Sequence, residues 1–310
     1  MVLLVEKLSH SLKPSSKLEN HHHRRHDHGR SEDLSASLQA FQSHVSSCMN
    51  KLSLDSIPGS EFISLSWIHQ CLELLSNLNR AFAKLVMEID YPLSKWDITS
   101  TEEYLNYSLK LLDFLNVIAS SLSDLGRARM SISHALSLID GSPESAMERF
   151  KAVRLIKNLD KEIKVEEKEG EEEKRLCCGD KKWLFGEALM VMKRNGYWVC
   201  GIVLLGLSGD TRPCLEMEKL CRGFLSPSAM AAMKKNGAAK EVREVNDGVV
   251  YLVAAVAMGE NYCEAGKNLE GKLEAMEKLL DGIGTRADGL FSEIMAGRIE
   301  LLDSLRQMKP

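Results

Sequence analysis

Apolar residues recur at intervals of three and four along most of the chain, most clearly between Leu65 and Ile139. Such spacing returns side chains to one helical face, because an α-helix has 3.6 residues per turn. Two helices are therefore predicted, from Leu65 to Ile89 and from about residue 100 to Ile139. The loop Tyr91-Pro92-Leu93-Ser94-Lys95-Trp96 separates them, since proline disfavours helical geometry in the preceding residue. A loop this short folds the second helix back along the first as an antiparallel hairpin.

Seven apolar residues on these two stripes are predicted to be buried: Leu72, Leu75, Phe82, Leu111, Leu115, Ile118 and Leu122. Two polar residues, Asn79 and Arg129, interrupt the stripes. Each could fix the register of its helix by demanding a partner, or could lie at the edge of the packed face, which we favour. At the start of the second helix, Ser100 and Glu103 have the spacing of a capping box.

The same periodicity predicts further helices on both sides of the hairpin. Their expected ranges are 32–52, 143–159, 181–208, 215–221, 242–262 and 269–308. Ser142 and Pro143 mark one of the starts, since proline is favoured at the first helical position. No segment alternates with the period of two that strands show. The predicted fold is therefore all-α: an elongated bundle of long antiparallel amphipathic helices with a disordered N-terminal tail.

Two apolar runs are long enough to raise the question of a membrane. The uncharged run 195–209 directly follows Lys193 and Arg194, and the run 249–258 has only ten residues. Both are shorter than the roughly 20 apolar residues that a spanning helix needs. We therefore predict that both belong to buried core helices and that there is no transmembrane helix.

Charge and composition divide the chain into three parts. Residues 1–31 carry six histidines, six Lys/Arg and three acidic residues without periodicity, so a disordered His/Arg-rich tail is predicted. Residues 32–308 form the helical domain, with N-terminal helices at 32–160 and C-terminal helices at 181–308. Between them, 161–180 is a charged linker, because acidic and basic residues fill it almost without apolar anchors. Segment 162–178 is expected to be disordered or poorly packed.

The overall charge and the cysteines limit the possible partners and locations. A net charge of −4 with both signs mixed provides no basic face for nucleic acid. The eight cysteines have no CxxC spacing and suit the reduced thiols of a cytoplasmic protein. The Ser-, His- and Arg-containing tail leaves a plastid location open, although Glu6, Glu19 and Asp27 argue against a transit peptide.

Motifs that carry chemistry are missing from the sequence. Walker, GxSxG, HExxH and GxGxxG patterns do not occur, so no catalytic, cofactor-binding or metal-binding residues are assigned and no cofactor is expected. The histidines at 21–23, 26 and 28 could chelate a metal, but a solvated tail explains them better. Cys177 and Cys178, flanked by basic residues, are a possible acylation site, with unmodified thiols as the favoured alternative.

Several blocks resemble the plant-specific BYPASS family across roughly residues 32 to 308. The blocks are Ile63-Ser64-Leu65-Ser66-Trp67-Ile68, the loop 91–96, 104–113, Ala188-Leu189-Met190, Tyr197-Trp198-Val199-Cys200-Gly201, Leu207-Ser208-Gly209 and the C-terminal 291–302. This resemblance implies a non-enzymatic helical protein of plant growth regulation. The family is associated with restraint of a root-derived mobile signal that arrests shoot growth.

Three functions are compatible with this sequence. The leading hypothesis is a regulatory or scaffold protein whose helices contact other proteins. The second is a peripheral membrane adaptor, suggested by Cys177, Cys178 and the apolar helix that follows them. The third is an enzyme or carrier for a small apolar metabolite, which would need an internal cavity; a core packed shut around Trp198 and Tyr251 would remove its basis.

Overall fold

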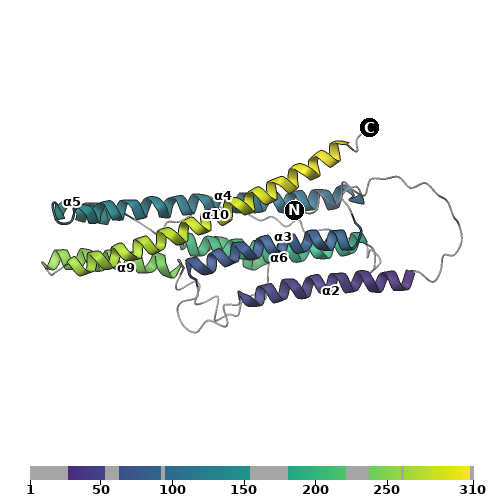
Figure 1. Ribbon diagram of the computed structural model, residues 1–310, viewed down its shortest axis with the longest axis horizontal. Helices are drawn as coiled ribbons and strands as arrows, with labels where there is room; N and C mark the ends of the chain where they lie inside the picture. Colours follow the sequence, from purple (N-terminus) through teal and green to yellow (C-terminus); the bar gives the residue numbers. More distant parts are fainter. Residues whose placement is uncertain are drawn as a thin grey trace.

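The computed structural model describes residues 27–52, 63–91, 95–153, 181–220, 237–259 and 262–307 (Figure 1). Every regular element in these ranges is an α-helix, which confirms the predicted all-α fold. The helices are α2 (Asp27–Lys51), α3 (Leu65–Glu88), α4 (Ile98–Leu138), α5 (Pro143–Ala152), α6 (Lys181–Ser208), α7 (Arg212–Leu220), α9 (Lys240–Met258) and α10 (Cys263–Gln307).

Two long antiparallel helices, α4 and α10, run along the elongated molecule (Figure 1). They contain 41 and 45 residues, so each is about 60 Å or more in length at 1.5 Å per residue. At one end α3 and α6 pack with them and α2 covers α3 and α6, and at the other end α5 packs on α4 and α9 on α10. The chain reverses direction between α3 and α4 as predicted, but the two helices do not pack against each other along their lengths; both pack against α6 and α10 instead.

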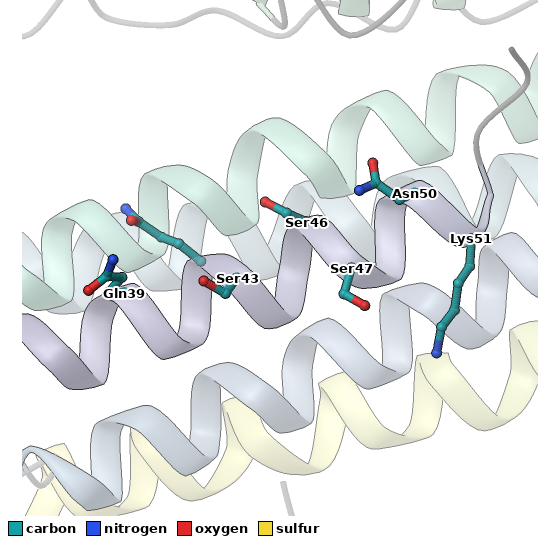
Figure 2. Close-up of a pocket in the computed structure, with 7 residues that line it drawn as sticks. Gln39, Ser43, Ser46, Ser47, Asn50 and Lys51 are labelled. Carbon is teal, nitrogen blue, oxygen red and sulfur yellow. The ribbon is translucent and has the colours of Figure 1, made fainter.

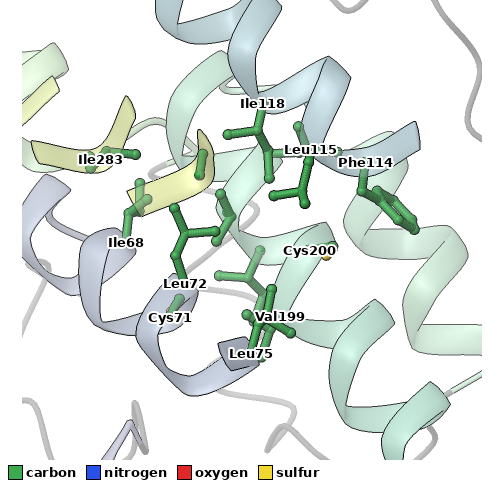
Figure 3. Packing of buried hydrophobic residues seen from close by; sticks show 14 of the residues in the cluster. Ile68, Cys71, Leu72, Leu75, Phe114, Leu115, Ile118, Val199, Cys200 and Ile283 are labelled. Atoms are coloured by element: carbon green, nitrogen blue, oxygen red, sulfur yellow. The ribbon is translucent and has the colours of Figure 1, made fainter. Parts of the chain in front are cut away.

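The central helix of the bundle is α6, which contacts α2, α3, α4 and α7. All its residues from 195 to 208 are buried. By length and composition α6 could cross a membrane, yet 78% of its apolar window is buried inside the protein. The prediction of a buried core helix at 181–208 is thus confirmed. Figure 3 shows the core next to it, where side chains of α3, α4, α6 and α10 meet.

Six of the seven residues predicted to be buried are buried, and Leu122 is the exception. Leu122 is half-buried because it lines an open groove between α4 and α10. Gly126 and Gly284 line the same groove and have no side chains to fill it. Our preference for an edge position was wrong for Asn79, which is only 8% exposed.

Several helix boundaries differ from the predicted ones, among them that of α10, which begins at Cys263 rather than at residue 269. The first helix begins at Asp27, five residues before the expected start. At α4 the cap is Asp97 rather than Ser100: Asp97 Oδ1 accepts a hydrogen bond from the Ser100 amide at 2.8 Å. An acidic side chain serves this role as well as serine does. At α5 the helix ends at Ala152, because Val153 has extended geometry with φ −80° and ψ 132°.

The apolar run 249–258 is not the fully buried helix that we predicted. In α9, Leu252 and Ala255 are buried against the bundle, whereas Val250, Tyr251 and Met258 are 62%, 65% and 74% exposed. A helix at the side of a bundle buries only the stripe that faces its neighbours. The apolar residues on its other face therefore remain in contact with solvent.

Some sequence predictions concern residues outside the described ranges. These are the tail up to residue 26, with most of its histidine run, and the linker region 154–180, which includes Cys177 and Cys178. The tail and linker assignments and the acylation site remain predictions.

Candidate interaction site

The C-terminal part of α10 is attached to the beginning of α4 through one partly buried arginine. Arg298 Nη1 donates to the Leu105 carbonyl oxygen and to Ser108 Oγ, the latter at 2.6 Å. Ser108 Oγ in turn donates to the Tyr104 carbonyl oxygen at 2.8 Å. Desolvation lowers the pKa of the Arg298 guanidinium. Two of the sequence blocks noted above, 104–113 and 291–302, therefore meet at this point.

A second contact fixes the register of the same two helices. Arg129 Nη2 and Glu277 Oε1 form an ion pair at 2.6 Å, with the Arg129 side chain 20% exposed. Arg129 therefore lies near the edge of the packed face, which was the favoured prediction. It also has a partner on another helix, which the alternative prediction required. Because the two contacts lie far apart along the helices, they define one antiparallel alignment of α4 and α10.

On its other side α10 is held to α3. Glu293 accepts hydrogen bonds from Ser76 Oγ at 2.8 Å and from Arg80 Nη2 at 3.1 Å. Ser76 is fully buried, whereas Arg80 lies at the surface. The carboxylate thus satisfies a buried hydroxyl group that would otherwise be costly to desolvate.

The hairpin loop is attached to α6 by a cluster of aromatic rings. Phe185 packs against Trp96 and Tyr91, with ring centroids 4.5 and 5.8 Å apart. Trp96 Nε1 also donates to the Tyr91 carbonyl oxygen at 3.1 Å. These distances are typical of favourable aromatic pairs. Tyr91 and Trp96, which belong to the loop that resembled the BYPASS family, therefore serve packing.

Lysines of α6 pair with carboxylates of the hairpin. Lys181 lies 3.3 Å from Asp90, and Lys182 lies 2.6 Å from Asp97. Burial opposes ionisation of Asp97, but hydrogen bonds from Lys182 and Ser100 outweigh it and lower the pKa of Asp97 to about 2. These two lysines, which flank the predicted acylation site in sequence, are therefore engaged by the protein's own acids.

A tight corner joins α3, α6 and the start of α9. The Ala239 amide donates to the Gly206 carbonyl oxygen at 2.7 Å, and the Leu65 amide donates to Glu241 Oε2 at 2.8 Å. A Cβ atom on Gly206 would lie 2.7 Å from atoms of Ile63 and Ile68. Sequence reasoning did not identify Glu241, because its partner is 176 residues away.

Burial explains the shifted titration of the core thiols and tyrosines. It raises the pKa of Cys71 well above its ordinary value, raises that of Cys200 to about 12 and raises that of Tyr107. Groups shifted in this direction are poor nucleophiles near neutral pH. Cys71 lies in the core near Cys200 (Figure 3), whereas His69 faces Gly282 of α10. The sequence neighbours His69 and Cys71 are therefore not a catalytic pair.

Two grooves on the surface of the described residues are open to solvent. One has a volume of about 670 Å³ and runs along α2 (Figure 2). It is lined by polar residues: Gln39, Gln42, Ser43, Ser46, Ser47, Asn50 and Lys51. The other, about 450 Å³, is the α4–α10 groove next to Leu122. No group of three potential metal ligands occurs in the described part of the chain. Neither groove is the enclosed apolar cavity that a metabolite carrier needs.

Exposed apolar side chains gather on two faces. Ile98 and Leu109 of α4, together with Ile299 and Leu302 of α10, form what we call the α4–α10 strip. Val250, Tyr251 and Met258, with the exposed Ala254 and Ala257 between them, form the α9 face. These two faces contain seven of the nine exposed large apolar residues described. Such clustering is typical of contact surfaces.

Fold and surface together define an all-α bundle protein with exposed apolar helix faces. The chain belongs to the ROH1-like family, whose model matches residues 13–197. It is also 23% identical over 297 residues to Protein BPS1, chloroplastic, from Arabidopsis thaliana, covering 87% of this chain and 84% of that protein. The predicted membership of the BYPASS-related family is thereby confirmed.

A shorter similarity links the chain to UPF0496 protein 4 of rice. In Oryza sativa subsp. indica and subsp. japonica alike, this protein is 29% identical over 109 residues. The match covers 35% of this chain and 24% of the relative. No solved structure matches the chain.

Proposed function

We propose that this protein is a non-enzymatic helical regulator or scaffold of plant growth that acts through contacts with other proteins. The observation that carries this proposal is the gathering of exposed apolar residues on the α4–α10 strip and the α9 face. The similarity of the chain to Protein BPS1 supports a role in plant development. The restraint of a mobile root-derived signal is part of the same proposal and comes from the family resemblance.

The charged residues support contacts rather than catalysis. Asp97, Glu277 and Glu293 each pair with a basic side chain of another helix. Such pairs hold helices in register, and these three carboxylates are therefore engaged in contacts between structural elements. We accordingly assign the side chains with shifted pKa values to structural roles.

The proposal is tested by affinity purification of the tagged full-length protein from plant tissue. Two surface variants, Leu109→Ser/Ile299→Ser and Val250→Ser/Tyr251→Ser, are compared with the wild type after circular dichroism has confirmed their folding. We expect reproducible partners with the wild type and loss of at least one partner with a variant. An identical partner list for all three proteins would overturn the proposal.

A second candidate is a peripheral membrane adaptor, for which α6 is suited by length and composition only. Its expected location would be a membrane fraction, whereas the leading proposal places the protein in the cytoplasm or in the plastid named for the Arabidopsis relative. Fractionation of tissue that expresses a C-terminally tagged chain separates these locations. Complete recovery without detergent would exclude the adaptor.

A further inference from the structure

We propose that the α4–α10 strip is the docking surface for an amphipathic helix of a partner protein whose polar flanks are basic. This inference rests on the proposed function and assigns a surface and a partner chemistry to it. It begins from the exposure of the strip: Ile98 is 79%, Leu109 47% and Ile299 53% exposed.

The two arginine contacts show that the strip is continuous across both helices. Arg298 reaches Leu105 and Ser108, and Arg129 reaches Glu277, in an antiparallel arrangement. In this register Leu109 lies about level with residue 295, and Leu105 about level with Ile299. Leu105 and Met295 are half-buried and pack against the core, so they complete the floor between the exposed residues.

The dimensions of the strip suit a helix. Residues 98 and 109 are separated by about 16 Å along α4 at 1.5 Å per residue, the length of three turns. A partner helix with apolar residues at i, i+3, i+4 and i+7 presents a stripe about 10 Å long at the same rise, which fits within this length. The strip also lies on two helices that Arg298 holds together, and a rigid surface loses little entropy on binding.

The exposed charges on the strip favour a basic partner. Glu102 and Asp113 lie on the exposed side of α4, and Asp303 lies on that of α10 next to Leu302. On α10, Arg306 and Asp303 pair with each other at 3.1 Å and so offset each other's charge, and Arg298 donates into α4. Glu102 and Asp113 therefore carry the acidic character of the strip. A second copy of this chain would bring the same acids to the interface, and an anionic membrane would also be repelled. Lysine or arginine next to an apolar stripe complements this surface.

The experiment uses the full-length chain and two fluorescein-labelled 14-residue peptides. Both peptides carry leucine at i, i+3, i+4 and i+7; the polar positions are lysine in one and glutamate in the other. Binding is measured by fluorescence anisotropy at low and moderate salt. We expect the lysine peptide to bind at least tenfold more tightly than the glutamate peptide, with weaker binding at higher salt.

Variants separate the two parts of the argument. Leu109→Ser/Ile299→Ser tests the exposed apolar residues, and Glu102→Lys/Asp113→Lys tests the acidic flank; each should weaken binding of the lysine peptide at least tenfold. Val250→Ser/Tyr251→Ser removes apolar residues from the α9 face and should leave binding unchanged. All the substituted residues are exposed, so the variants should remain folded, and circular dichroism checks this.

Several outcomes would overturn the inference. These are failure of the lysine peptide to bind, equal binding of both peptides, or binding that the strip variants do not alter. A dimer in light scattering that Leu109→Ser/Ile299→Ser abolishes would assign the strip to a second copy. Binding of phosphatidylglycerol vesicles that the same variant abolishes would assign it to a membrane. If tissue partners depend on the α9 face alone, the proposed function stands and this inference fails.

Discussion

Arg298 of α10 and Ser108 of α4 are 190 residues apart in sequence and are joined by a 2.6 Å hydrogen bond. The same guanidinium nitrogen also donates to the Leu105 carbonyl oxygen. One side chain thus connects the longest helix described in the N-terminal half with the last helix of the described chain. The α4–α10 strip exists only while these two helices are aligned.

Arg298→Ala should lower the free energy of unfolding by about 1–3 kcal/mol, because Ser108 loses a partner and charge-assisted hydrogen bonds disappear. Urea denaturation of the full chain measures the change. Arg306→Ala is the matched control, since Arg306 is largely exposed and pairs only with Asp303 in its own helix. That control should change stability by less than about 0.5 kcal/mol. Equal effects of the two substitutions would contradict the role of Arg298.

Leu115→Ala should destabilise the protein by roughly 2–5 kcal/mol, the usual cost of truncating a core leucine. Leu115 is 2% exposed among residues of α3, α6 and α10 (Figure 3). Leu109→Ala, on the same helix but 47% exposed, should cost less than about 1 kcal/mol. Chemical denaturation of both variants provides the comparison. A change below about 0.5 kcal/mol for Leu115 would place this residue outside the core.

Gly206→Ala should destabilise the corner between α3 and α6 by about 1–3 kcal/mol, the range found when a packed core is overfilled. The added methyl group would lie 2.7 Å from Ile63 and Ile68. Gly126→Ala makes the same chemical change where nothing lies within 4 Å. It should raise stability by up to about 1 kcal/mol, since alanine favours helix more than glycine does. Thermal melts of the two variants should therefore shift in opposite directions.

Stability should fall in acid as Asp97 is protonated. Its pKa is lowered from 3.8 to about 2 in the folded protein, so its contribution is fully present above 3.8 and is lost as pH falls towards 2. Urea denaturation at pH 6, 4, 3 and 2.5 measures this decline. In Lys182→Met, which lacks the main lowering partner, the part of the decline due to Asp97 should be smaller. An unchanged pH dependence in this variant would show that the Lys182–Asp97 pair does not set the pKa.

The sequence predicts what depends on local periodicity. Leu111 and Ile118 could be assigned to the core because their spacing identifies one face of a helix, and α6 could be assigned because charges interrupt its apolar run. The exposed face of α9 was missed because the run from Val249 to Met258 is apolar on all sides of the helix. Periodicity then does not show which side faces the core. Only the packing against α10 and α5 decides which side is buried.

The candidate site was less accessible to sequence reasoning than the fold. Arg298 was noted as part of a family-like block, but its acceptors Leu105 and Ser108 lie in another block far away. Glu241 gave no signal at all, since an acid at a helix start is common. The α4–α10 strip combines residues of both ends of the helical domain, so it becomes visible only when the two helices are placed side by side.

The central claim, that this bundle acts through protein contacts, is tested most directly by quantitative affinity purification from plant tissue. The wild type is compared with Leu109→Ser/Ile299→Ser and with Val250→Ser/Tyr251→Ser at equal expression. The account predicts partners that are enriched reproducibly with the wild type and depleted at least tenfold with at least one of the two variants. Partner lists that are indistinguishable among the three proteins, or a wild type that retains no partner, would contradict it.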